Sequence, residues 1–485
     1  MAARAVLPAL LASACLLSTP ASADTLKEAL TRAYQDNPSL EAARAQQRAL
    51  DETVPIQRSF GLPSVDLSVT HVELLQQSTP AIVSPSRRLS GSANLGVPIY
   101  QGGAVRNGIR AAEERVEAGR ADLRGTESAL FSAVVAAYMD VILNEALVGL
   151  AANNIEVLGT NLEATSDRFQ IGDLTRTDVA QSQSRLAIAE GDLFSARANL
   201  IAARENYVAL VGVPPDDLQP PPPLPALPAS PDEAVDVALA NNPDLIAAIE
   251  RAQAAGYDIE VAGAGRLPTL SVFTRSDYTN FLGTLTPENN VGTDITAGVT
   301  LSVPIFQGGR VAAQQRQAGA QARAALEQAI AVERDVIASV RAAYSSWRAS
   351  RAIIESSQLA VEAAALSLEG VRAENTVGNR TVLDILDAQQ ELLRAQVQLV
   401  TARRNAYVAG FNLLAEMGRA EARDLGLGDD GVLYDPVANY DRVRGIIWDW
   451  QRDPLPVATS SSTVDIPAAD GEIGPSDSLS EFGDD

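Results

Sequence analysis

Residues 376–389 read TVGNRTVLDILDAQ, and residues 170–183 read QIGDLTRTDVAQSQ. Gly172 and Gly378 stand at matching places in these two stretches and are 206 residues apart (378 − 172). Each stretch joins two long segments rich in helix-forming residues. Self-similarity at a fixed offset indicates a tandem repeat. The sequence therefore predicts two similar halves, each of which turns back on itself between two helices.

The similarity continues outside the two turns. Asn37-Pro38 is matched by Asn242-Pro243 at an offset of 205, and VPIYQGG at 97–103 is matched by VPIFQGG at 303–309. Both kinds of motif lie where one element should end and another should begin, because proline and glycine interrupt regular structure. The two halves are therefore expected to share their corners as well as their turns.

These landmarks divide the chain into segments. The first repeat is expected over 24–213 and the second over 232–419, joined by residues 214–231, which hold nine prolines in 18 positions and predict an extended linker. Residues 420–452 are expected to pack on the outside of the repeats. Residues 453–485 are acidic and rich in serine, proline and glycine, which predicts a disordered tail.

Composition excludes several classes of protein. The formal charge of −23 over 485 residues argues against a nucleic-acid partner. Residues 1–23 have the pattern of a signal peptide, with Arg4 before an apolar run and Ala21-Ser22-Ala23 as a cleavage site. The single cysteine, Cys15, lies in this segment, where it also fits a degenerate lipoprotein signal. The mature chain then has no cysteine, and no metal or other cofactor is expected.

Four stretches show the two-residue period of strands: residues 64–75, 89–99, 269–281 and 293–305. Within 89–97, for example, apolar or small residues alternate with serine, asparagine and glycine. One apolar and one polar face over about ten residues is typical of a strand in a membrane barrel. No apolar run near the ~20 residues of a spanning helix follows the signal. Membrane insertion is therefore expected through these strands.

Long helices should follow the strands. Residues 103–169 lack proline and predict a rod of about 100 Å, and residues 178–212 predict a second helix of about 50 Å. A helix over 38–58 is expected to stack end to end with the second one. The predicted fold class is mainly α with a membrane β-barrel, built from two tandem repeats of a strand hairpin and a long helical hairpin.

Four strands cannot close a barrel, and open sheet edges are not tolerated in lipid. Three chains would supply twelve strands, and cyclic symmetry is the usual way to share them. The expected product is a duct whose helices continue below the membrane. A periplasmic coiled-coil scaffold without a pore is the alternative, but it has no use for alternating strands. An enzyme is not expected, because no catalytic constellation is present.

These motifs make the chain similar to the TolC family of outer-membrane efflux proteins over residues 25–419. The resemblance rests on the VPI[YF]QGG corners, on the turn from Arg168 to Ala180 and on the turn from Val377 to Ala388. It implies a homotrimer in the outer membrane with a 12-stranded barrel and a 12-helix periplasmic tunnel. It also implies a periplasmic adaptor and an inner-membrane partner, either an RND-type pump or an ABC exporter.

The resemblance assigns a pore constriction to Asp384 and Asp387. Their i, i+3 spacing puts both on one side of a helix, and three chains would stack two rings of carboxylates. Such rings attract cations. The alternative reading is a solvated, charged helix face.

The resemblance also assigns polar links that hold the entrance shut. The matching positions are Thr177 and Asp178 on one turn and Arg380 on the other, while Asn375 stands where the family has a tyrosine. The alternative role for Thr177 or Asp178 is an ordinary helix cap.

The hairpin tips are expected to contact the adaptor. Glycine at each tip fits the left-handed conformation of a helix hairpin. The residues assigned to this contact are Gly172, Asp173, Leu174, Gly378 and Asn379.

Overall fold

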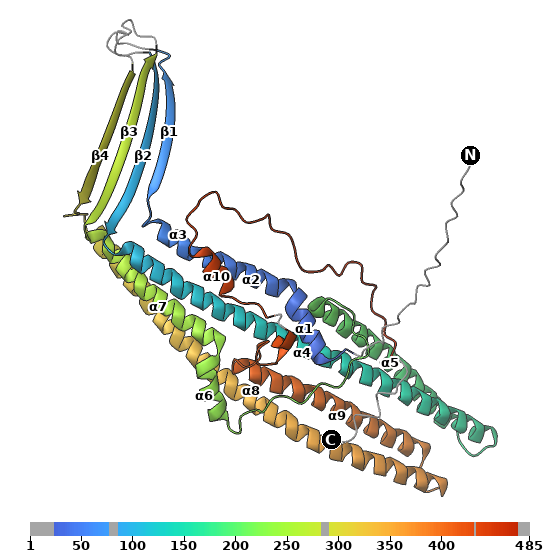
Figure 1. The fold of residues 1–485 in the computed structure, drawn as a ribbon. Helices are drawn as coiled ribbons and strands as arrows, with labels where there is room; N and C mark the ends of the chain where they lie inside the picture. Colours follow the sequence, from blue (N-terminus) through green and yellow to red (C-terminus); the bar gives the residue numbers. More distant parts are fainter. Residues whose placement is uncertain (1–23, 77–85, 283–290, 431–432, 474–485) are drawn as a thin grey trace, which may run out of the picture.

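The computed structural model describes residues 24–76, 86–282, 291–430 and 433–473. A sheet stands at one end of an elongated molecule, long helices lead away from it, and two helical hairpins end at the opposite extremity (Figure 1). The predicted signal peptide, with Cys15, lies outside the described residues.

The sheet has four antiparallel strands in the order β1–β2–β3–β4. They are β1 (Ser64–Glu73), β2 (Arg87–Gln101), β3 (Thr269–Leu282) and β4 (Val291–Ser302). All four predicted strands are therefore confirmed. Each half of the chain contributes one hairpin, and β2 and β3 join the two hairpins into one sheet.

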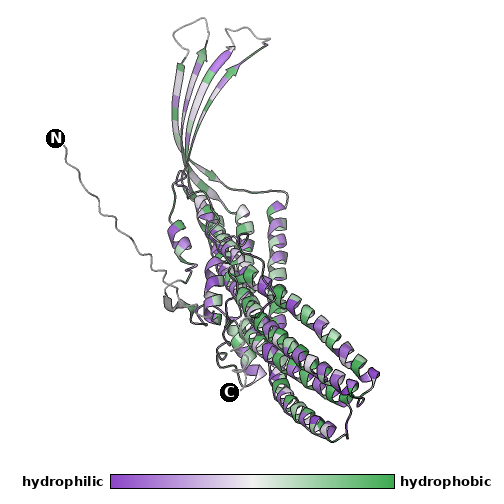
Figure 2. Ribbon diagram, turned by 90° about the vertical axis from the view of Figure 1, so that its right-hand side faces the viewer, coloured by the Kyte–Doolittle hydropathy of each residue, from purple (hydrophilic) through white to green (hydrophobic). Residues whose placement is uncertain are grey.

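The register places apolar side chains on one face of this sheet. Val97 pairs with Val272, which in turn pairs with Val299, and directly opposed residues share a face. On the other face Asp66 pairs with Asn94. Figure 2 shows polar and apolar residues interleaved along the strands. Among the described residues β1 and β4 each have one free edge, so the sheet has the faces of a barrel wall but is not closed by one chain.

The fourth strand is shorter than predicted. It ends at Ser302 rather than near residue 305, whereas β2 continues to Gln101. A proline lies near this end of both β2 and β4. The interior strand β2 passes Pro98 with a register shift because Tyr100 still pairs with β3. The edge strand β4 has no second neighbour, and Pro304 offers no N–H to continue the ladder.

The long helices form two hairpins. They are α4 (Ala104–Gln170) with α5 (Arg176–Val211), and α8 (Arg310–Thr376) with α9 (Val382–Glu416). Helices α4 and α8 each have 67 residues, which is about 100 Å of helix as predicted. Helix α7 (Pro243–Gly263) packs against both, and a 3-10 turn (Ala264–Arg266) links it to β3.

The shorter helices near the N-terminus differ from the prediction in one respect. Helix α1 (Leu26–Asp36) begins with a capping box between Thr25 and Glu28. The helix predicted over 38–58 is divided into α2 (Pro38–Asp51) and α3 (Thr53–Ser59). Pro55 explains the break, because it has no N–H to donate to the preceding turn.

The repeated Asn-Pro dipeptides hold matching joints together. Asn37 caps the helix that begins at Pro38, and its side-chain amide donates to the carbonyl of Leu210 at 2.9 Å. Asn242 caps α7 in the same way and donates to the carbonyl of Glu416, also at 2.9 Å. Each asparagine therefore joins the start of one helix to the last turn of another.

Buried tyrosines fix the proline-rich linker. The Tyr138 hydroxyl donates to the carbonyl of Gln219 at 2.6 Å, and the Tyr344 hydroxyl donates to that of Ala229 at 2.8 Å. Tyr407 donates to the carbonyl of Pro222 at 3.0 Å. The linker then enters α6 (Pro231–Asn241). Tyr138 and Tyr344 are matched at an offset of 206 residues, and together with Tyr407 they bind the extended linker to the helical layer.

One described helix, α4, contains an 18-residue window apolar enough to cross a membrane, although no such run was expected after the signal peptide. Half of that window is buried inside the chain. Phe131, Val135 and Val141 from this region belong to the main core. Packing against neighbouring elements within the chain therefore covers half of this window.

The C-terminal segment packs on the repeats as predicted. It contains a 3-10 turn (Leu427–Asp430) and α10 (Ala438–Val443), and Leu427 joins the main core. Beyond it, residues 453–473 differ from the disordered tail expected from composition. Ser461 donates its backbone N–H to Asp36 at 3.2 Å, and Asp470 pairs with Arg204 at 2.8 Å. Polar partners on α1 and α5 thus order this stretch without regular secondary structure.

Candidate functional site at the hairpin ends

Both hairpins turn through a glycine in the left-handed region. Gly172 has φ of 84° and Gly378 has φ of 82°. A Cβ at either position would meet no neighbouring atom, so backbone conformation rather than packing requires glycine here. The following N–H groups of Asp173 and Asn379 donate back to the carbonyls of Arg168 and Glu374. These bonds close the C-terminal ends of α4 and α8.

The helices that follow begin with matching capping boxes. The Thr175 hydroxyl accepts from the N–H of Asp178, and the Asp178 carboxylate accepts from the N–H of Thr175 at 2.8 Å. Thr381 and Asp384 repeat the arrangement at the start of α9. The cap residue is therefore Thr175, not Thr177 or Asp178. The spacing was visible in the sequence, because both turns read Thr-x-x-Asp.

These caps influence the charge of the two aspartates. Hydrogen bonds from Thr175 lower the pKa of Asp178, and hydrogen bonds from Thr381 lower the pKa of Asp384. Both carboxylates therefore stay ionised at neutral pH. They stabilise their own helices within the chain, whatever further role they have at an entrance.

Within one chain Arg380 pairs inside its own hairpin. Its guanidinium lies 2.7 Å from the carboxylate of Glu374 and 3.8 Å from that of Asp384. The side-chain amide of Asn375 donates to the Arg380 carbonyl at 2.7 Å. Among the contacts of the described residues, none joins Arg380 to Thr177 or Asp178. The second turn is thus a self-contained polar network.

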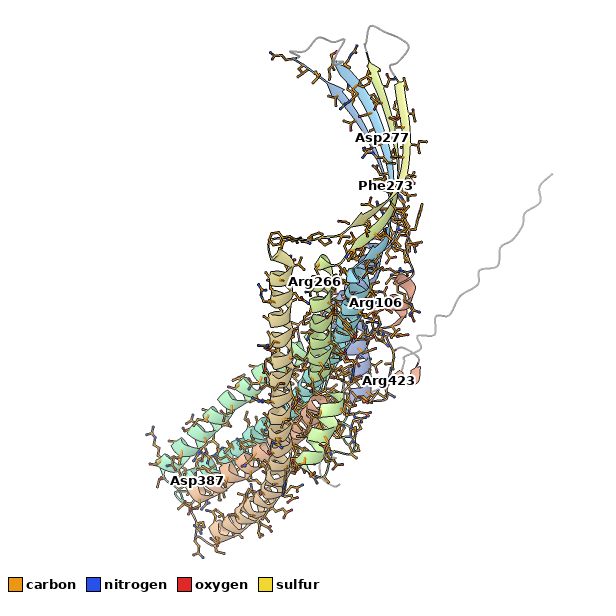
Figure 3. The ribbon with its side chains drawn as sticks, turned by 90° about the vertical axis from the view of Figure 1, so that its left-hand side faces the viewer. Arg106, Arg266, Phe273, Asp277, Asp387 and Arg423 are labelled. Carbon is orange, nitrogen blue, oxygen red and sulfur yellow. The ribbon has the colours of Figure 1, made fainter. Side chains whose placement is uncertain are left out.

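Near the free ends, a different ion pair joins the two hairpins. Arg185 on α5 lies 2.7 Å from the carboxylate of Asp387 on α9. Near it, the side-chain amide of Asn161 donates to the Gln389 side chain at 3.1 Å. Figure 3 places Asp387 near the free ends of the hairpins, far from Asp277 in the sheet. The sequence reasoning selected Asp387 but missed Arg185, because no motif marks an arginine whose partner lies 202 residues away.

A small apolar cluster accompanies these polar links. Leu158, Ala189 and Leu386 are buried together, one from each of α4, α5 and α9. Near the free ends, the described contacts between the hairpins thus include this apolar cluster and two polar contacts. Farther from the ends, Arg404 on α9 pairs with Asp140 on α4 at 2.8 Å, and the main core joins the two hairpins.

The tips themselves are exposed and partly apolar. Ile171 and Val377 are 81 % and 71 % exposed. Beside Ile171, the Asp173 carboxylate pairs with Arg168 at 2.7 Å. The apolar residues next to the glycines were not selected from the sequence, although their offset of 206 residues was visible. Each tip presents one large apolar side chain within a polar rim.

Comparison with known proteins identifies the family. The model of the "Outer membrane efflux protein" family matches residues 29–213 and again residues 234–419. The chain belongs to the outer membrane efflux protein family. Members of this family are channels that lie in the outer membrane and reach into the periplasm. They form trimers that work with periplasmic adaptors and inner-membrane pumps.

Individual relatives agree with this assignment. The chain is 34 % identical over 438 residues to the outer membrane efflux protein BepC of Brucella suis, covering 90 % of this chain and 94 % of that protein. It is 26 % identical over 441 residues to the outer membrane protein TolC of Escherichia coli, covering 87 % of each. The solved structure of VceC from Vibrio cholerae matches with a TM-score of 0.69 and 22 % identity, covering 81 % of this chain and 96 % of that one.

The efflux family assignment decides between the alternatives left open by the sequence. This outer membrane efflux protein is an export tunnel of the outer membrane, with a helical barrel continuing a β-barrel. The scaffold without a pore is therefore excluded.

Proposed function

We propose that three copies of this chain form a tunnel whose periplasmic entrance is closed by the hairpin ends. The observation that supports this is the small number of contacts between the free ends of the two hairpins. The described contacts at this end include one exposed ion pair, Arg185–Asp387, one hydrogen bond, Asn161–Gln389, and one small apolar cluster. An exposed pair contributes about 0–1 kcal/mol, so the closed state rests on weak links that a docking partner can replace.

The constriction consists of Asp384 and Asp387 from each protomer. Asp384 is ionised through its capping hydrogen bonds, and Asp387 has a cation beside it in the closed chain. Separation of Arg185 from Asp387 leaves carboxylates without that partner at the entrance. An entrance lined by carboxylates favours cations over anions.

Thr177, Asp178, Arg380 and Asn375 supply the contacts between neighbouring protomers. Asp178 and Arg380 sit on different hairpins and do not pair within the chain. In a closed ring the first hairpin of one protomer adjoins the second hairpin of the next. Arg380 then exchanges its contact with Glu374 for one with Asp178.

The tips bind a periplasmic adaptor, which couples the tunnel to an inner-membrane RND-type pump or ABC exporter. Gly172, Asp173 and Leu174 on one hairpin and Gly378 and Asn379 on the other surround the exposed Ile171 and Val377. The apolar face of the sheet contacts outer-membrane lipid. The cargo passes along the lumen as small molecules or polypeptides.

Conductance across a planar bilayer tests the entrance. The purified protein is expected to show small, cation-selective steps. Asp384→Asn with Asp387→Asn should reduce cation selectivity, and Arg380→Ser should increase conductance. Arg394→Ala is the matched control for Arg380→Ser, because Arg394 pairs with Glu391 on the same helix. Equal selectivity of the unmodified protein and the double aspartate variant would place the constriction elsewhere.

A further inference from the structure

An apolar surface near the membrane end of the helices lies outside the part of the chain that matches the family. It consists of Ile447, Trp448 and Trp450, which are 69 %, 68 % and 75 % exposed. The second family match ends at residue 419. Large exposed aromatic residues are unusual on a soluble surface and indicate an interaction site.

Contacts of α10 and Arg444, which precede these three residues, place the start of this segment along the molecule. Asn439 donates to Asp51 at the end of α2 at 2.7 Å, and Tyr440 packs against the cluster formed by Val54 and its neighbours. The guanidinium of Arg58 in α3 donates to the carbonyl of Arg444 at 2.8 Å. Figure 1 shows α10 beside α3, the helix that leads into β1.

These contacts bring the tryptophans close to the start of the strands. Helix α3 ends at Ser59, and β1 begins at Ser64. The N–H of Gln451 donates to the carbonyl of Trp448 at 3.1 Å, which forms a turn around the exposed side chains. Phe60, at the end of α3, is also exposed. The apolar surface therefore adjoins the end of the sheet from which the helices descend.

That end of the sheet is the periplasmic boundary of the membrane. The apolar sheet face begins at once with Val65, which is exposed in the single chain and pairs with Leu95 on the same face. Tryptophan is enriched at membrane–water interfaces, where its ring reaches the acyl boundary and its N–H meets polar headgroups. Arg452 follows the tryptophans in the sequence, and an arginine side chain at this depth reaches phosphate groups.

We propose that Ile447, Trp448 and Trp450 anchor the chain in the headgroup region of the periplasmic leaflet. The partner is phospholipid. This proposal depends on the outer-membrane location of the strands and not on the proposed gate. In a trimer it would recur three times around the tunnel and hold the helical barrel at a fixed depth below the lipid.

Fluorescence provides a direct test because the sequence has only three tryptophans. Trp347→Phe leaves Trp448 and Trp450 as the reporters. The matched control is Trp448→Phe with Trp450→Phe, which leaves Trp347 on α8, in edge contact with the Tyr344 ring at 5.7 Å. Both full-length proteins are reconstituted in phosphatidylethanolamine–phosphatidylglycerol vesicles with or without lipids brominated near the headgroup.

Bromination is expected to lower the emission of the Trp448 and Trp450 reporters roughly twofold and to leave that of Trp347 unchanged. Lipids brominated near the chain end should quench less. Resistance of the trimer to SDS without heating confirms that both variants are folded. Unquenched emission from Trp448 and Trp450 would overturn the proposal, and a blue-shifted but unquenched spectrum would show that a neighbouring protomer covers them.

Discussion

Replacement of Arg185 by alanine gives a quantitative test of how weakly the entrance is closed. The guanidinium lies 2.7 Å from Asp387 and is the ionic link between α5 and α9. The two side chains are 35 % and 59 % exposed, so the pair is screened and contributes about 0.5 kcal/mol within a range of about 0–1. Three copies that separate together contribute about 1.5 kcal/mol. The ratio of open to closed channels should then rise roughly tenfold.

The assay is the open probability of single channels in a planar bilayer at low salt. Arg394→Ala is the control, because Arg394 pairs at 3.8 Å with Glu391 on the same helix and links no hairpins. Arg185→Asp combined with Asp387→Arg should restore the closed state. The difference between Arg185→Ala and the unmodified channel should shrink in 1 M salt, where charges are screened beyond about 3 Å.

Two results would refute this reasoning. An unchanged open probability for Arg185→Ala would mean that the pair does not hold the hairpins. An equal increase for Arg394→Ala would mean that loss of an arginine anywhere on the second helices of the hairpins has the same effect.

Further predictions concern stability. Burial raises the pKa of the Glu127 carboxyl to about 7 from 4.5. The stability that the protonated carboxyl contributes to the fold is therefore present below pH 4.5 and is lost as the pH rises through 7. Glu127→Gln should therefore raise the unfolding temperature at pH 8, by an amount equivalent to at most about 3 kcal/mol, and leave it unchanged at pH 4.5; equal gains at both would contradict the assignment. Asn242→Ala should cost about 1–2 kcal/mol in denaturant unfolding, and Asn242→Asp, which keeps the cap acceptor, should cost less; the reverse order would argue against the cap. Removal of residues 454–485 deletes exposed contacts such as Asp470–Arg204 and should lower the unfolding temperature less than Asn242→Ala does; loss of the folded trimer would show that the tail is structural.

Much of the fold could be predicted because the sequence signals are local and repeated. The glycines at 172 and 378 mark the hairpin turns, since only glycine takes a φ near 80° without strain. Alternation of apolar and polar residues located the strands to within a few residues at most ends. The break between α2 and α3 was not predicted from Pro55. A proline is tolerated in the first turn of a helix, so its presence alone does not show whether a helix ends there.

The site was less predictable because its contacts join distant parts of the chain. Asp384 and Asp387 could be selected from their spacing, but the partner of Asp387 depends on how α5 lies against α9. The resemblance directed attention to Arg380, whose contacts within the chain are with Glu374 and Asp384. The order in residues 453–473 depends on polar partners such as Asp36 and Arg204, and composition carries no information about them.

The tyrosines that bind the linker have a mechanical consequence. Tyr138, Tyr344 and Tyr407 bind the same proline-rich linker to both hairpins. The height of these three tyrosines along the helices is therefore the point about which the hairpins pivot. From Tyr344 to Gly378 there are 34 residues (378 − 344), and the same number separates Tyr138 from Gly172, which gives each lever arm a length of about 50 Å. A tilt of about 10° at this pivot displaces a tip by about 9 Å on an arm of that length. Small rotations of the hairpins near the linker are thus sufficient for large displacements of the hairpin ends, while the helices between the linker and the sheet stay in place.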